Sequence, residues 1–249
     1  MKILLLETYR TLFGPISYFD IALWITVIFT SFFIIFYTLH KFDLKSKQMS
    51  KLQKLNILTW IIFFFLIGIT GVLNLIWRYL ITEDTLRDFL DDLTYFLCEL
   101  AFLSKILFTE YSINQYKFYK GYYFSIFFFL LIPLTTIILP EPVGEIGIID
   151  ILYIVLFSTG VMLFPVIFLY IAFKLEGEER RMALKITIGY IFLIIGILFQ
   201  PQNLTILKPF ISNFELFSDV FLILCPFLLL CGILIMFSSY HKTLHPDLN

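Results

Sequence analysis

The chain alternates between long apolar runs and short polar loops. A bilayer core about 30 Å thick needs roughly 20 apolar residues in a helix, because lipid offers the backbone no hydrogen-bond partners. Seven runs meet or approach this length, and we expect each to form a transmembrane helix. They cover residues 16–39, 57–80, 89–108, 122–139, 148–173, 183–200 and 216–240. The predicted fold is therefore all-α, a single seven-helix bundle over residues 1–249.

The composition supports the membrane interpretation. Hydrophobic residues make up 60% of the chain and the mean hydropathy is +0.92. A water-soluble globule of 249 residues would need far more polar surface than this sequence contains. The formal net charge is −1, and we expect the lipid bilayer, not nucleic acid, to be the main partner.

The loops change sign from one to the next. The loops after the first, third and fifth runs are basic, and those after the second and fourth are acidic. Because lysine and arginine are retained on the cytoplasmic side, this pattern predicts a multi-pass cell-membrane protein with an extracellular N-terminus and a cytoplasmic C-terminus. We expect a basic inner face that contacts anionic lipid headgroups or a separate cytoplasmic effector. Its residues are Lys45, Lys47, Lys51, Arg180 and Arg181.

The third run carries the most unusual polarity. At about 100° per residue, six polar residues fall on one face that descends from the preceding loop toward the middle of the run. These are Asp84, Asp88, Asp91, Asp92, Tyr95 and Glu99. The first acids also have an ordinary explanation, since carboxylates near a helix N-terminus interact favourably with the helix dipole.

Glu99 needs a different explanation, because it lies about ten residues into the run. An ionised side chain at that depth is costly, so Glu99 stays protonated, faces a hydrated cavity or meets a base from another helix. We predict an outward-opening acidic cavity with Glu99 at its floor. Its other candidate residues are Asp91, Asp92, Tyr95, Asp150 and Asp219. Lys105 lies on another face, and we expect it to extend to the inner headgroups.

Metal-ligand candidates are few. His241 and His245 have the four-residue spacing of two zinc ligands on one helical face, and His40 directly follows the first run. The ordinary alternative is that these are interfacial histidines beside a basic tail, since Pro246 breaks a helix at that point. Gly189 and Gly196, seven residues apart, are predicted to allow close helix packing.

One segment carries a family resemblance. Residues 178–184 read Glu-Glu-Arg-Arg-Met-Ala-Leu and lead into the sixth run, which contains Gly189. This basic turn before an apolar helix resembles the seven-helix sensory modules that precede histidine kinases and cyclases in bacteria and archaea. The resemblance covers the last three runs. It implies signalling to an output partner, and because the sequence stops at Asn249 we expect that partner to be a separate protein.

The overall topology is also similar to that of rhodopsins and G-protein-coupled receptors, but their motifs are absent. The seventh run has no lysine for a retinal Schiff base, so no cofactor is expected, and the third run lacks an Asp-Arg-Tyr ending. We therefore favour a receptor-like or sensory protein. A proton- or cation-coupled carrier that uses Glu99 is the alternative, and a lipid-modifying enzyme is the third choice.

The source is predicted from composition. Only four alanines stand against 31 phenylalanines, and isoleucine and lysine are abundant. This usage is typical of an AT-rich genome and favours a prokaryote.

Overall fold

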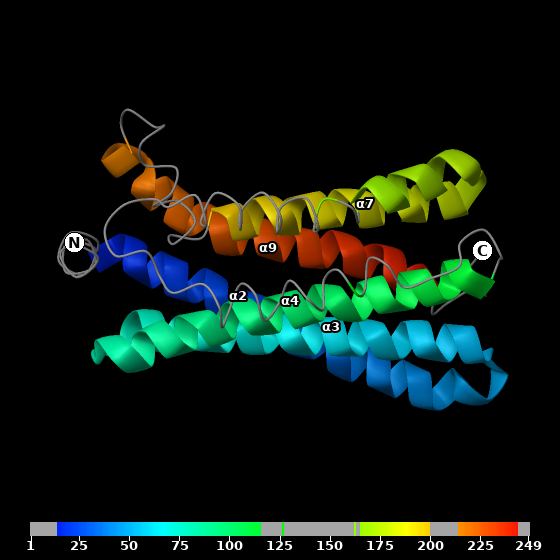
Figure 1. The fold of residues 1–249 in the computed structure, drawn as a ribbon, viewed down its shortest axis with the longest axis horizontal. Coiled ribbons are helices and arrows are strands. Elements are labelled where there is room, and N and C mark those ends of the chain that lie inside the picture. Colours follow the sequence, from blue (N-terminus) through cyan, green and yellow to red (C-terminus); the bar gives the residue numbers. More distant parts are fainter. Residues whose placement is uncertain (1–13, 116–125, 127–161, 163–164, 200–213, 244–249) are drawn as a thin grey trace. The chain divides into compact units, whose positions relative to one another are not determined.

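The computed structural model describes residues 14–115, 126, 162, 165–199 and 214–243. Within these residues all regular structure is helical, which confirms the all-α prediction for this part of the chain (Figure 1). The helices are α2 (Gly14–Lys45), η1 (Ser46–Gln48), α3 (Lys51–Leu75), η2 (Ile76–Leu80), α4 (Asp84–Gln115), α7 (Gly177–Leu198) and α9 (Phe214–Thr243). A further apolar helix covers Pro165–Lys174.

Four described helical segments are long and apolar enough to cross a membrane. They are Ser17–Gln48, Lys51–Leu80, Gly177–Leu198 and Val220–Ser239. These segments correspond to the first, second, sixth and seventh predicted runs. The described part of the chain is therefore compatible with a membrane-embedded helical protein.

The other three predicted runs are not among these four segments. The third lies within the continuous helix α4, whose acids and Lys105 make it too polar to count among the four apolar segments. The helix Pro165–Lys174 covers the end of the fifth run. The fourth run and most of the fifth lie outside the described residues, so seven spans remain a prediction.

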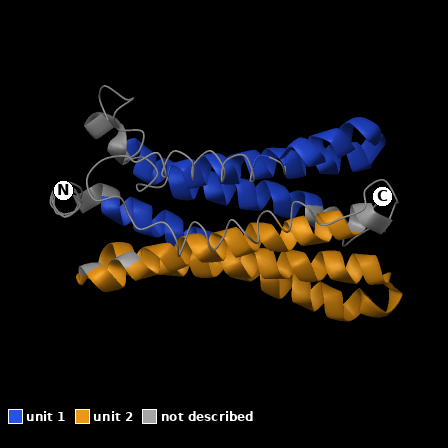
Figure 2. Cartoon of the chain, in the orientation of Figure 1, with its two compact units in different colours: residues 1–27, 141–239 blue, residues 28–140, 240–249 orange. Residues whose placement is uncertain are grey.

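The chain divides into two compact units (Figure 2). Unit 1 comprises residues 1–27 and 141–239, and unit 2 comprises residues 28–140 and 240–249. The helix α2 contributes its first part to unit 1 and its second part to unit 2.

In unit 2, the C-terminal part of α2 packs together with the helices α3 and α4. A capping box starts α3: the Ser50 hydroxyl accepts from the Gln53 N–H at 3.2 Å, and the Gln53 side chain accepts from the Ser50 N–H at 2.9 Å. Aromatic rings fill the contact between α3 and α4. Phe63 meets Phe102 edge to face, with ring centroids 5.8 Å apart. This packing fixes which face of α4 lies against α3.

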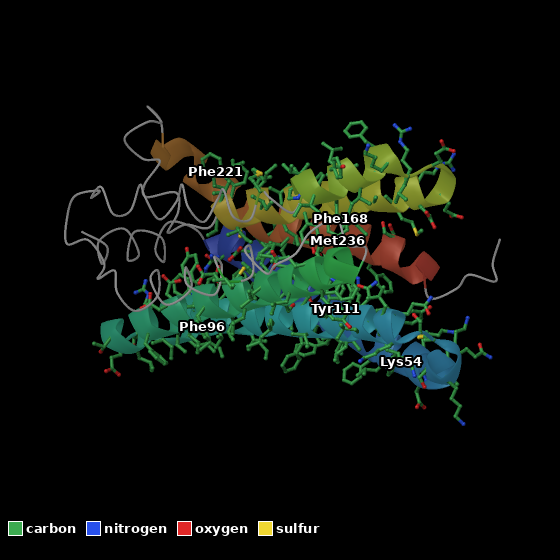
Figure 3. The ribbon with its side chains drawn as sticks, turned by 45° about the vertical axis from the view of Figure 1, so that its right-hand side comes forward. Lys54, Phe96, Tyr111, Phe168, Phe221 and Met236 are labelled. Atoms are coloured by element: carbon green, nitrogen blue, oxygen red, sulfur yellow. The ribbon has the colours of Figure 1, made fainter. Side chains whose placement is uncertain are left out.

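In unit 1, α7 and α9 approach closely at glycines. A β-carbon on Gly196 would lie 3.1 Å from the Cys225 carbonyl oxygen, and one on Gly189 would collide with the Met236 side chain, which Figure 3 labels on α9. The prediction of close packing at Gly189 and Gly196 is confirmed. The sequence analysis did not identify Gly232, where a β-carbon would lie 2.7 Å from the Gly189 carbonyl oxygen.

Replacing Gly232 with alanine is expected to destabilise the protein by about 1–3 kcal/mol, because the added methyl group meets backbone that cannot move aside. Gly68→Ala is the matched control, since its β-carbon would lie 3.4 Å from the Phe32 ring and the Ser31 β-carbon, and we expect a change of less than about 1 kcal/mol. Thermal unfolding in detergent measures both. Equal stabilities for the two variants would contradict the close approach of α7 and α9.

Candidate functional site

The helix α4 has an exposed apolar face. Leu86, Phe89 and Leu107 are exposed, Phe89 to 60%. Phe89 and Leu107 are separated by about five helical turns and therefore point the same way. The charged residues in the second half of α4, Lys105 and Glu110, are buried within the protein.

A second face of α4 lies against α3 (Figure 1). Phe102 is fully buried there and contacts Phe63. Thr94 and Thr109, also buried, satisfy their hydroxyl groups within the helix by donating to the Leu90 and Lys105 carbonyl oxygens at 2.8 Å. The hydroxyl groups of these threonines are therefore satisfied within α4.

The predicted acidic stripe becomes more buried along the helix. Asp92 is exposed, Asp91 and Tyr95 are half-buried, and Glu99 is only 1% exposed. The side chains of Asp84 and Asp88 lie outside the described residues. Because α4 is continuous, these positions do share one side of one helix.

The sequence analysis missed Glu110. It follows Glu99 by eleven residues, which is about three turns, so both carboxyl groups lie on the same side of α4. Both side chains are buried in the structure. The eleven-residue spacing was the available signal, but Glu110 lies beyond the end of the third apolar run.

The burial of Lys105 contradicts the prediction made for this residue. We expected it to extend away from the helix to lipid headgroups, but the structure buries it, with 2% of the side chain exposed. Its ammonium donates to Thr59 Oγ1 at 3.3 Å and to Asn56 Oδ1 at 3.5 Å, and it lies 3.7 Å from the Trp60 ring centroid. The side chain turns toward α3 because α3 offers oxygen acceptors and an aromatic face at that level.

Several other predicted site residues are not described by the structure. Asp150 and His245 lie outside the described residues; Asp219 and His241 are in α9, but their side chains are not described. His40 is exposed. No group of three or more metal-ligating side chains occurs among the described residues. Of the basic residues, Lys47, Lys51, Arg180 and Arg181 are exposed and Lys45 is half-buried.

Two further buried charged residues were not predicted from the sequence. Asp20 on α2 is fully buried, and Arg78 is buried in the π-helical turn η2. The Arg78 guanidinium carbon lies 5.3 Å from the ring centroid of Trp77. The signal for both was a charged residue within an apolar run, which usually marks a functional or paired position.

No family model, no curated protein and no solved structure matches the chain. By its fold, the chain is a helical protein with four apolar segments of membrane-spanning length among its described residues.

Replacing Phe102 with alanine is expected to destabilise unit 2 by about 3–5 kcal/mol, since it leaves a cavity beside Phe63 in the contact that positions α4. Phe89→Ala, on the exposed face of the same helix, is expected to change stability by less than about 0.5 kcal/mol. Thermal or chemical unfolding compares the two. A similar effect of both would show that α4 is not packed on α3 through Phe102.

Proposed function

We propose that the chain is a receptor-like, sensory seven-helix membrane protein with its N-terminus outside and its C-terminus in the cytoplasm. Four apolar helices support the membrane part of this proposal. The alternating charge of the loops supports the orientation. In this arrangement, α4 begins at the outer surface, and its acidic stripe opens outward.

The observation that carries the sensory proposal is the burial of Glu99. A carboxyl group within an apolar helix is costly when ionised, and such residues mark sites where protons or cations act. The stripe above it, with Asp92 exposed and Asp91 half-buried, attracts cations toward Glu99. The expected ligand class is therefore a proton or a cationic molecule.

A change of charge at Glu99 would act on helix packing. Between Leu55 and Leu75 the adjacent helix α3 has no charged residue. The other buried charged residues described in unit 2 are Lys105 and Glu110 on α4 and Arg78 in η2. Gain or loss of a proton would therefore shift the preferred position of α4 on α3.

The output would occur at the opposite end. Lysines gather around the turn between α2 and α3, where Lys47 and Lys51 are exposed, and Arg180 and Arg181 are exposed near the start of α7. These cations suit anionic headgroups or an acidic surface of a separate effector. Movement of α4 would change the access of the effector to Lys47 and Lys51, which belong to the same unit as α4.

A carrier is the second candidate, and Glu110 favours it. Glu99 and Glu110 lie on one side of α4, roughly 16 Å apart along the axis at 1.5 Å per residue. Two buried carboxyl groups at this separation could serve as successive proton acceptors in a transport pathway.

A spin-label distance measurement tests the sensory mechanism. Labels at Leu58 on α3 and Leu107 on α4, both exposed, are placed in protein reconstituted into lipid nanodiscs. Lowering the pH is expected to shift the interlabel distance of the wild-type protein by about 2 Å, the scale of helix shifts in switching proteins. Glu99→Gln, which keeps the side chain neutral, should abolish the shift.

Asp43→Asn is the control, because Asp43 is an exposed acid on α2, outside the stripe, and it should keep the shift. The mechanism fails if the wild-type distance does not respond to pH, or if Glu99→Gln responds like the wild type. Proton flux in proteoliposomes separates the two candidates: flux that Glu99→Gln abolishes indicates a carrier, and helix movement without flux indicates a sensor.

A further inference from the structure

The buried Lys105 has a neutral set of partners. Its ammonium contacts Asn56 Oδ1, Thr59 Oγ1, the Trp60 ring and, at 5.4 Å from the ring centroid, the Phe108 ring. Within the described part of the chain these four groups are its hydrogen-bond and cation–π partners, and none of them is charged. A buried ammonium held in this way needs acceptors that are well placed.

One face of α3 supplies three of these four groups. Asn56, Thr59 and Trp60 have spacings of three and four residues, so they are neighbours on the helix surface. The Thr59 hydroxyl donates to the Asn56 backbone oxygen at 2.8 Å. Its proton is therefore already used, and its oxygen is left to accept from an ammonium.

The aromatic wall of this face is also fixed in advance. The Trp60 ring stacks on Phe64, with centroids 5.5 Å apart, and meets Phe63 edge to face at 5.9 Å. Trp60 and both phenylalanines are buried. Tryptophan is the ring that binds cations best, and the cation must lie over its face, as Lys105 does. The Thr59 hydroxyl and the Trp60 ring are thus held by contacts within α3 that do not involve Lys105.

We propose that Asn56, Thr59 and Trp60 form an ammonium-binding niche on α3, and that Lys105 fills this niche as a tethered occupant, latching α4 to α3. The ligand class is a primary ammonium, which offers N–H donors to two oxygens and a cation to the ring. The niche accepts a free primary ammonium when the lysine side chain is shortened. The proposal stands on the α3–α4 contact and does not rest on the sensory function.

Chemical rescue tests the niche directly. Lys105→Ala is expected to lower the melting temperature of the protein by about 5 °C, through loss of the cation–π and hydrogen-bond contacts. Methylammonium should restore the melting temperature in a saturable way. Tetramethylammonium, which has no N–H donor, and potassium should not restore it at equal ionic strength.

Trp60 provides a second readout. The chain has three tryptophans, so Trp24→Phe with Trp77→Phe leaves Trp60 as the single fluorophore. In this background, Lys105→Ala should change the Trp60 emission, and methylammonium should reverse the change over the same concentration range. Trp24 and Trp77 are buried, and replacing both can prevent folding. The melting-temperature experiment is therefore performed with both tryptophans present, and it tests the niche without the fluorescence readout.

Lys105→Met tests the latch by whether the substitution raises or lowers the melting temperature. If Lys105 were only a tolerated buried charge, a neutral side chain of similar length would leave stability unchanged or raise it. The latch predicts a lower melting temperature, because the side-chain oxygens of Asn56 and Thr59 lose their donor. Lys174→Met is the matched control: Lys174 is exposed and lies 5.7 Å from the Tyr170 ring centroid, and we expect no change.

Three results would overturn the proposal. The first is a Lys105→Met protein that is as stable as the wild type or more stable. The second is a Lys105→Ala protein on which methylammonium has no effect. The third is an equal response to methylammonium in Lys105→Ala and Lys174→Met, which would indicate a general effect of the salt.

Discussion

Charged side chains that are buried beside apolar helices impose the strongest constraint on this molecule. Glu99, Lys105 and Glu110 all belong to α4 and are all buried. Desolvation of each ionised group is costly, so the surrounding protein must supply hydrogen bonds, rings or opposite charge at defined positions. Lys105 shows one solution, in which α3 supplies two oxygens and the face of Trp60.

This constraint explains how α4 is arranged. Its exposed apolar residues, such as Phe89 and Leu107, fall on one side, and the buried charged residues fall on the others. Rotation of the helix would expose Glu99 to an apolar surrounding and would withdraw Lys105 from Trp60. The apolar contact of Phe102 with Phe63 therefore acts together with the polar contacts of Lys105 to define a single register. By contrast, α7 and α9 are positioned by close approach at glycines.

Among the described residues, hydropathy predicted where the long helices lie but not where they end. The second run was assigned to residues 57–80, whereas α3 begins at Lys51 after the Ser50 capping box and continues through η2 to Leu80. Apolar length marks the segment that fits a bilayer, but a helix extends through polar residues until its backbone groups are capped. Periodicity on α4 correctly placed the acidic stripe on one side of the helix.

The partners of the buried charges could not be predicted in the same way. A single sequence does not show which residues of α3 face α4, so Asn56, Thr59 and Trp60 gave no signal that Lys105 would turn inward. Gly232 was missed for the same reason, because its importance depends on the Gly189 backbone opposite. The sequence shows that Asp20 and Glu110 are charged residues, but only their burial in the structure distinguishes them from solvated ones.

We propose that α4 crosses the membrane with Phe89 and Leu107 facing lipid and Glu99 and Lys105 facing protein. Single spin labels along α4 in lipid nanodiscs test it most directly, through collision with oxygen, which concentrates in lipid. The account predicts high oxygen accessibility at Phe89 and Leu107 and low accessibility to oxygen and to a water-soluble reagent at Glu99 and Lys105. High accessibility of Glu99 to oxygen, or access of the water-soluble reagent along the whole helix, would contradict it.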